Sequence, residues 1–163
     1  MAFDKMEWHY GGDYPEGLPD ENGGTHIGMF LAWIIARDLI GEMHHKNSQE
    51  AIRRVLKREI TGRDFLITEC DERLWEEDIS EEGLAFVQDY YDSETAFAQQ
   101  YADYLQDYCD VFNAHAAANG FEYESIYHIE NSWENVDRLM PTLDKRYQEW
   151  QVWHRNPANS DES

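Results

Sequence analysis

The chain has 163 residues and carries 34 Asp and Glu against 13 Lys and Arg, which gives a formal net charge of −21. Because like charges repel, this balance argues against direct binding to nucleic acid or anionic membranes, and it favours a basic partner. The alternative is that the acids only solvate the surface. A hydrophobic content of 42% is sufficient for the core of a single domain spanning residues 1–163.

Two further features bear on the cellular compartment. The sequence shows no apolar stretch of the secretory type and none long enough to cross a membrane, so we expect a cytoplasmic protein. The two cysteines, Cys70 and Cys109, lie far apart and lack metal-ligand spacing. They are therefore predicted to be small buried apolar side chains and not a disulfide framework.

Residues 1–24 are rich in Gly and Pro, with Trp and Tyr between them, which predicts an ordered loop held by aromatic side chains. The next segment includes Ile27–Ala36, ten residues without a polar side chain. Its apolar residues fall on two helical stripes, and such a helix must be covered on most sides. We therefore expect a buried central helix at about residues 25–43, capped by Asn22 or Thr25.

The rest of the chain predicts shorter helices separated by turns. Side chains that can cap a first helical turn mark four helix starts, at Ser48, Thr61 with Asp64, Ser80 and Ser132. Asp92 or Ser93 can start a long helix that ends at Gly120. Residues 121–129 alternate in polarity and predict one short strand or an extended arm, and residues 156–163 are expected to fray. The predicted fold is a mainly α, single-domain helical bundle.

Negative charge is concentrated in one part of the sequence. Between Arg73 and Arg138 there is no Lys or Arg, although this interval holds 16 Asp and Glu and seven of the ten tyrosines. Solvated surfaces ordinarily mix both signs, and Tyr is enriched at interfaces, so the interval is predicted to dock a basic surface. The alternative is an acidic face with its tyrosines in the core. The residues predicted to contact the partner are Glu81, Glu82, Asp89, Tyr90, Asp103, Asp107 and Asp110, the three helical aspartates sharing one face.

Motifs for catalysis or metal binding are weak. The seven histidines show none of the HxxxH, HxH or HExxH spacings, and the chain contains no GxSxG, Walker-type or GxGxxG motif. Cys70 is flanked by acids, which raise a thiol pKa and make a poor nucleophile. The best enzyme-like group is His9, Asp13 and His26, which any Gly-rich aromatic loop could also hold for hydrogen bonding alone. We therefore expect no enzyme, cofactor or metal, and keep a small His/Asp-based or metal-dependent enzyme as the alternative.

Three stretches carry a resemblance to a known family: WHYGGDYPEGLPDENGGTHIGMFLAWII, SEEGLAFVQDYY and SWENVDRLMPTLDKRYQEW. They resemble small acidic bacterial proteins encoded near polymorphic and contact-delivered toxins, where such proteins act as immunity proteins. The resemblance implies a helical, cytoplasmic, non-enzymatic inhibitor, and it implies no particular functional residues. The leading hypothesis is an immunity protein that binds a toxin with a basic active-site cleft, such as a nuclease. An adaptor with a non-toxin partner is a further alternative.

Overall fold

The computed structural model describes residues 2–160 and confirms a mainly α fold built around one buried helix. This helix is α2, Thr25–Ala36, and all of its residues from Thr25 to Ile35 are buried. It ends earlier than expected, because Asp38 adopts a left-handed backbone angle of 56° and turns the chain. The predicted caps are wrong: Gly24 occupies the cap position, no side chain caps the helix, and a 3₁₀ turn, η1 (Asp20–Gly24), precedes it.

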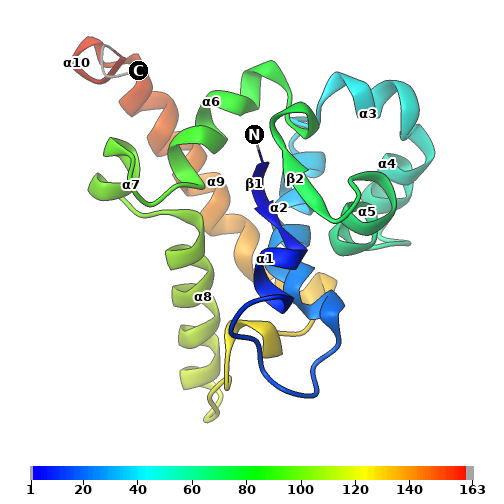
Figure 1. Cartoon of the computed structure of the whole chain (residues 1–163). Helices are drawn as coiled ribbons and strands as arrows, with labels where there is room; N and C mark the ends of the chain where they lie inside the picture. Colours follow the sequence, from blue (N-terminus) through cyan, green and yellow to red (C-terminus); the bar gives the residue numbers. More distant parts are fainter. Residues whose placement is uncertain (1, 161–163) are drawn as a thin grey trace.

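The helix α2 contacts α5 (Gly62–Glu69) most closely, because glycines from both helices meet. A Cβ atom added to Gly62 would lie 1.9 Å from the carbonyl oxygen of Gly28, so this approach requires a backbone without a side chain. Two short helices, α3 (Glu42–Asn47) and α4 (Gln49–Leu56), lie beside this pair (Figure 1). The capping box predicted at Thr61 and Asp64 is confirmed.

A long helix, α9 (Trp133–Arg155), runs past α2 and closes the core (Figure 1). Trp33 Nε1 donates a hydrogen bond of 2.8 Å to Asp144 of α9, and Arg37 binds the same carboxylate at 2.7 Å. Pro141 lies inside α9, which continues beyond it, and the predicted cap at Ser132 is confirmed. The polar tail forms a short helix, α10 (Pro157–Ser160), and the other residues predicted to fray, 161–163, lie outside the described part.

The first 24 residues form more regular structure than the predicted loop. A strand, β1 (Ala2–Lys5), pairs antiparallel with β2 (Arg73–Trp75), with Asp4 opposite Leu74 and an irregularity between Ala2 and Asp4. A short helix, α1 (Met6–Tyr10), follows directly. Sequence periodicity missed this sheet because each strand is very short and its partner lies about 70 residues away.

The acidic interval folds into η2 (Glu76–Asp78), α6 (Glu81–Tyr90), α7 (Ala96–Gln100), α8 (Tyr104–Ala118) and η3 (Ile126–His128). The long helix predicted from Asp92 or Ser93 is wrong, because the chain breaks after α7 and Asp103 caps a new helix. Of the two alternatives predicted for residues 121–129, the strand does not form, since no ladder partner lies beside it within the described residues. Residues 121–125 have neither helix nor strand, and η3 follows them. None of the helices described is long and apolar enough to cross a bilayer.

Candidate functional site

Two of the seven residues predicted to contact a partner are buried. The hydroxyl of Tyr90 donates a hydrogen bond of 2.6 Å to Asp107 Oδ2, and both side chains lie in the interior. Arg146 of α9 binds the two oxygens of Asp107 at 2.8 and 3.1 Å. The prediction that these side chains contact a partner is wrong, because this face of α8 packs against α6 and α9.

Two others are partly exposed and already have structural partners. Asp89 Oδ2 accepts a hydrogen bond of 2.8 Å from Trp150 Nε1. Asp103 Oδ1 accepts a hydrogen bond of 2.8 Å from the backbone N–H of Gln106 and so caps α8. Each carboxylate keeps one oxygen that these bonds do not use. They can therefore contribute negative charge to a surface while they hold the fold.

The remaining three predicted residues, Glu81, Glu82 and Asp110, are exposed. Asp110 accepts a hydrogen bond of 2.9 Å from Gln106 and forms no ion pair with a Lys or Arg of residues 2–160. Within that described range, the acids of the interval that pair with an arginine are Asp107, Glu134 and Asp137. Most of the exposed carboxylates on α6, on α8 and on the segment between these helices therefore face solvent without a neutralising cation.

Two hollows run along this acidic surface and share Tyr91 and Ser93. The first, of about 510 Å³, is lined by Ala2, Phe3, Glu76, Gln88, Tyr91, Asp92 and Ser93. The second, of about 350 Å³, is lined by Tyr91, Ser93, Asp103, Leu105, Gln106 and Cys109. Leu105 is 44% exposed at this edge, so the hollows combine carboxylates with apolar contact area. The sequence feature that pointed to this acidic surface was the interval without Lys or Arg between Arg73 and Arg138.

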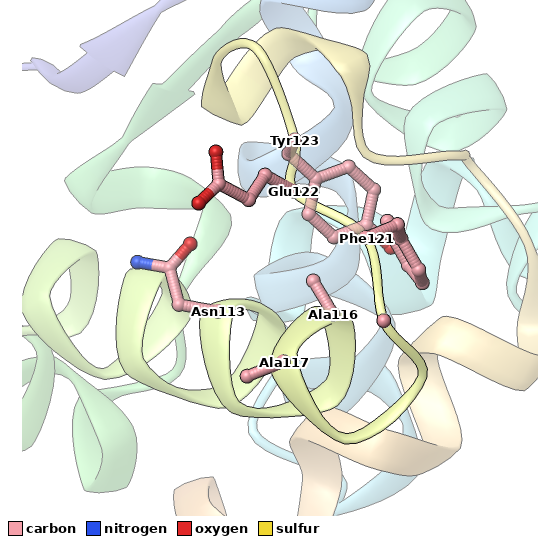
Figure 2. A pocket seen from close by; sticks show the side chains of 7 residues that line it. Asn113, Ala116, Ala117, Phe121, Glu122 and Tyr123 are labelled. Carbon is pink, nitrogen blue, oxygen red and sulfur yellow. The ribbon is translucent and has the colours of Figure 1, made fainter.

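A third hollow, of about 650 Å³, lies where α8 ends and the chain turns back (Figure 2). Ala116, Ala117 and Gly120 form one part of its lining. Figure 2 shows the Asn113 and Glu122 side chains on one side of this lining and the Phe121 ring on the other. The Phe121 and Tyr123 rings meet edge to face, with centroids 5.1 Å apart.

The His9 and His26 side chains come together as predicted, but the carboxylate between them belongs to Asp4. His9 Nε2 lies 2.7 Å from Asp4 Oδ1, and His26 Nε2 lies 3.0 Å from Asp4 Oδ2. Asp13, the predicted third member, is exposed and lies outside this cluster. Sequence reasoning missed Asp4 because its partners come from α1, from α2 and from Tyr91 after α6, and nothing in the local sequence between Phe3 and Lys5 marked it.

Four hydrogen-bond donors surround the Asp4 carboxylate. Oδ1 accepts from His9 and from the Lys5 backbone N–H at 2.9 Å, while Oδ2 accepts from His26 and from the Tyr91 hydroxyl at 2.7 Å. Burial raises the pKa of Asp4, but the hydrogen bonds from His26 and His9 outweigh it and hold this pKa well below its ordinary value. Burial lowers the pKa of His26, although Asp4 opposes that shift.

These three side chains also have the composition of a metal site, with two imidazole nitrogens and a carboxylate within 4.8 Å of one another. The observed distances of 2.7 and 3.0 Å are hydrogen-bond lengths. The arrangement is that of a buried anion held by its donors, and it ties β1, α1, α2 and α6 together.

A second buried cluster joins His44, Cys70 and Asp78. His44 Nε2 lies 2.7 Å from Asp78 Oδ1 and 3.7 Å from Cys70 Sγ, and its Nδ1 lies 3.1 Å from Ser48 Oγ. Burial raises the pKa of the Cys70 thiol, and Asp78 raises it further. The sulfur is thus protonated and shielded, unlike the exposed thiolate that nucleophilic catalysis requires. Cys70 is buried as predicted, but its neighbours here are polar, and Cys109 is only partly buried.

A family model described as a domain of unknown function (DUF7832) matches residues 2–128. The chain belongs to the DUF7832 family. No curated protein and no solved structure matches the chain. The matched DUF7832 region contains both histidine clusters and all three hollows. The helix α9 lies beyond it and supplies Arg146 and Asp144, the polar partners of α8 and α2.

Proposed function

We propose that this DUF7832 protein is an inhibitor that binds a basic protein through its acidic surface, as an immunity protein binds a toxin. The proposed contact surface consists of six of the exposed acids of the arginine- and lysine-free interval, namely Glu81, Glu82, Asp92, Glu94, Asp110 and Glu122. Asp89 and Asp103 flank this surface through their unused oxygens. The resemblance to immunity proteins and the two acidic hollows support the proposal.

The unpaired state of these acids is the observation that carries the proposal. Several exposed acids elsewhere on the molecule sit beside cations, such as Glu42 beside Lys46 and Glu50 beside Arg53, although exposed Asp13 and Glu16 form no ion pair within the described residues. Repulsion between like charges on one surface destabilises the folded protein. A partner of opposite charge relieves this repulsion when it binds. The acids therefore fit a docking surface better than an ordinary solvated face.

The charge also suggests how inhibition proceeds. An acidic surface steers a basic partner into contact, with association rates that reach ~10⁸–10⁹ M⁻¹s⁻¹ at low salt. Exposed Leu105, beside Asp103, supplies apolar area that excludes water once the partner has docked. A nuclease-type toxin with a basic cleft would lose substrate access in such a complex. The buried, hydrogen-bonded state of the Asp4 and His44 clusters favours this binding role over catalysis.

The test uses a basic, toxin-type protein as the partner, sought first among the products of neighbouring genes, and two charge-matched double variants. Glu82→Lys with Asp110→Lys reverses the proposed surface, whereas Asp13→Lys with Glu16→Lys reverses two exposed acids outside it. The first variant should bind at least about tenfold more weakly and fail to protect cells, since it puts like charges against the partner. The second should bind and protect as the wild type does.

Binding is measured by titration at two salt concentrations, with circular dichroism to verify folding. Wild-type affinity should fall as salt rises, because screening shortens the reach of the attraction. Equal affinities for all three proteins at both salt concentrations, with every variant folded, would rule out the acidic surface.

A further inference from the structure

The hollow at the end of α8 has the chemistry of a cation-binding site. Its polar lining consists of the Glu122 carboxylate and the Asn113 amide, and its aromatic lining consists of Phe121 and Tyr123 (Figure 2). Phe121 is 41% exposed, so its ring is accessible from solvent. No Lys or Arg lines the hollow, so its carboxylate has no cation beside it there.

The fold adds a second source of negative potential. The helix α8 has 15 residues and ends at Ala118, beside the Ala116, Ala117 and Gly120 lining. The C-terminal end of a helix carries a partial negative charge equivalent to about half an electron, which favours cations within the last turn. Gly120 permits the tight return, because its backbone angle of 74° is left-handed and no neighbouring atom fills the space beside it.

We propose that this hollow receives one arginine side chain of the basic partner, an inference that rests on the proposed function. A planar guanidinium can stack on an aromatic face while its N–H groups reach a carboxylate and an amide oxygen. Phe121, on one side of the hollow, and Glu122 and Asn113, on the other, supply those three kinds of contact to a side chain that enters between them (Figure 2). Lysine would gain the charge contact without the stacking, so arginine is the preferred occupant. The site would act as an anchor at one end of the acidic surface.

The test uses the free full-length protein and small probes, so it needs no toxin. N-acetylarginine amide is titrated against ¹⁵N-labelled protein, with N-acetylcitrulline amide as the uncharged probe of the same shape. Arginine should shift the backbone amides of residues 113–123 in a saturable manner, and citrulline should not. Glu122→Gln and Phe121→Leu should each weaken the arginine response about threefold or more, which matches the usual contribution of such contacts. Glu94→Gln, an exposed acid elsewhere, should leave it unchanged.

Equal responses to arginine and citrulline would overturn the proposal, as would arginine shifts that Glu122→Gln and Glu94→Gln affect alike. N-acetyllysine amide provides the comparison for specificity, and a response as strong as that to arginine would remove the stacking argument. Failure here leaves the docking surface intact, because Glu82 and Asp110 are tested by protection and not by this probe. Failure of protection, in turn, leaves arginine binding at this hollow measurable on its own.

Discussion

The carboxylate of Asp4 shows how a single residue can be charged and still stabilise the interior. Removing an ionised carboxylate from water costs several kcal/mol unless hydrogen bonds replace the lost hydration. Asp4 receives four, from His9, His26, Tyr91 and the Lys5 backbone. The cluster therefore links the N-terminal strand to the core only while His26 donates from Nε2 and Asp4 stays ionised.

This arrangement makes the stability of the protein depend on pH. The pKa of His26 is lowered from its ordinary 6.5 in the folded state, mainly by burial, so below that pH the unfolded chain binds more protons. The free energy of unfolding should therefore have its full value above about pH 6.5 and decrease as the pH falls below it. Asp4, whose pKa is also lowered, removes further stability at more acidic pH, below its ordinary 3.8.

Urea unfolding between pH 8 and pH 5 measures this dependence. His26→Gln should show a shallower loss of stability than the wild type in that range, because the difference between the two curves isolates the titration of His26. Its stability at pH 8 should be lower, since Gln does not reproduce the imidazole packing. Parallel curves for the two proteins would show that His26 does not carry the pH dependence.

At the scale of elements, α8 presents two aspartates one turn apart with different roles. Asp107 is buried and joins α8 to Arg146 of α9 and to Tyr90 of α6, whereas Asp110 is exposed. Asp107→Ala should lower the free energy of unfolding by about 3 kcal/mol, because it leaves the buried Tyr90 hydroxyl without its acceptor and removes one of the two carboxylates that bind Arg146, the other being Glu149. Asp110→Ala should change it by less than about 0.5 kcal/mol.

Urea unfolding of the two variants provides a matched comparison within one helix. Adding Arg146→Met to Asp107→Ala should recover part of the loss, since it removes a partly buried cation that has lost one of its two carboxylates. Similar small effects from Asp107→Ala and Asp110→Ala would contradict a structural role for the contacts of Asp107 with Tyr90 and Arg146.

The helices also show what the sequence could predict and why. Caps at Thr61, Ser80 and Ser132 were predictable because each cap depends on residues within four positions. The break between α7 and α8 was not, since Tyr104 and Tyr108 turn inward to pack against α2 and the chain must reorient to place them. The same reason hid Asp4 and the burial of Asp107, whose partners lie far away in sequence. The exposed acids, by contrast, followed directly from composition.

At the scale of the whole molecule, the uneven charge has a consequence for stability as well as for binding. Several acids outside the acidic interval pair with Lys or Arg, whereas the exposed acids on α6, on α8 and on the segment between these helices form no ion pair within the described residues. Exposed pairs contribute little, typically 0–1 kcal/mol each. With a net charge of −21, repulsion should therefore dominate the response to salt.

The melting temperature should accordingly rise as NaCl increases from about 10 mM to 0.5 M, where the Debye length falls from roughly 30 Å to a few ångströms. A triple variant, Glu94→Gln, Asp110→Asn and Glu122→Gln, should melt about 2–4 °C above the wild type at low salt, because it removes unpaired negative charge. That gain should shrink at high salt.

The matched triple variant Glu42→Gln, Glu50→Gln and Asp137→Asn removes the same charge from acids that pair with Lys46, Arg53 and Arg58, and it should show a smaller gain or a loss. Scanning calorimetry at both salt concentrations measures the melting temperatures of the wild type and of both triple variants. Identical shifts for the two triple variants would mean that net charge alone determines the stability, and not the placement of unpaired charge on α8 and its flanking segments.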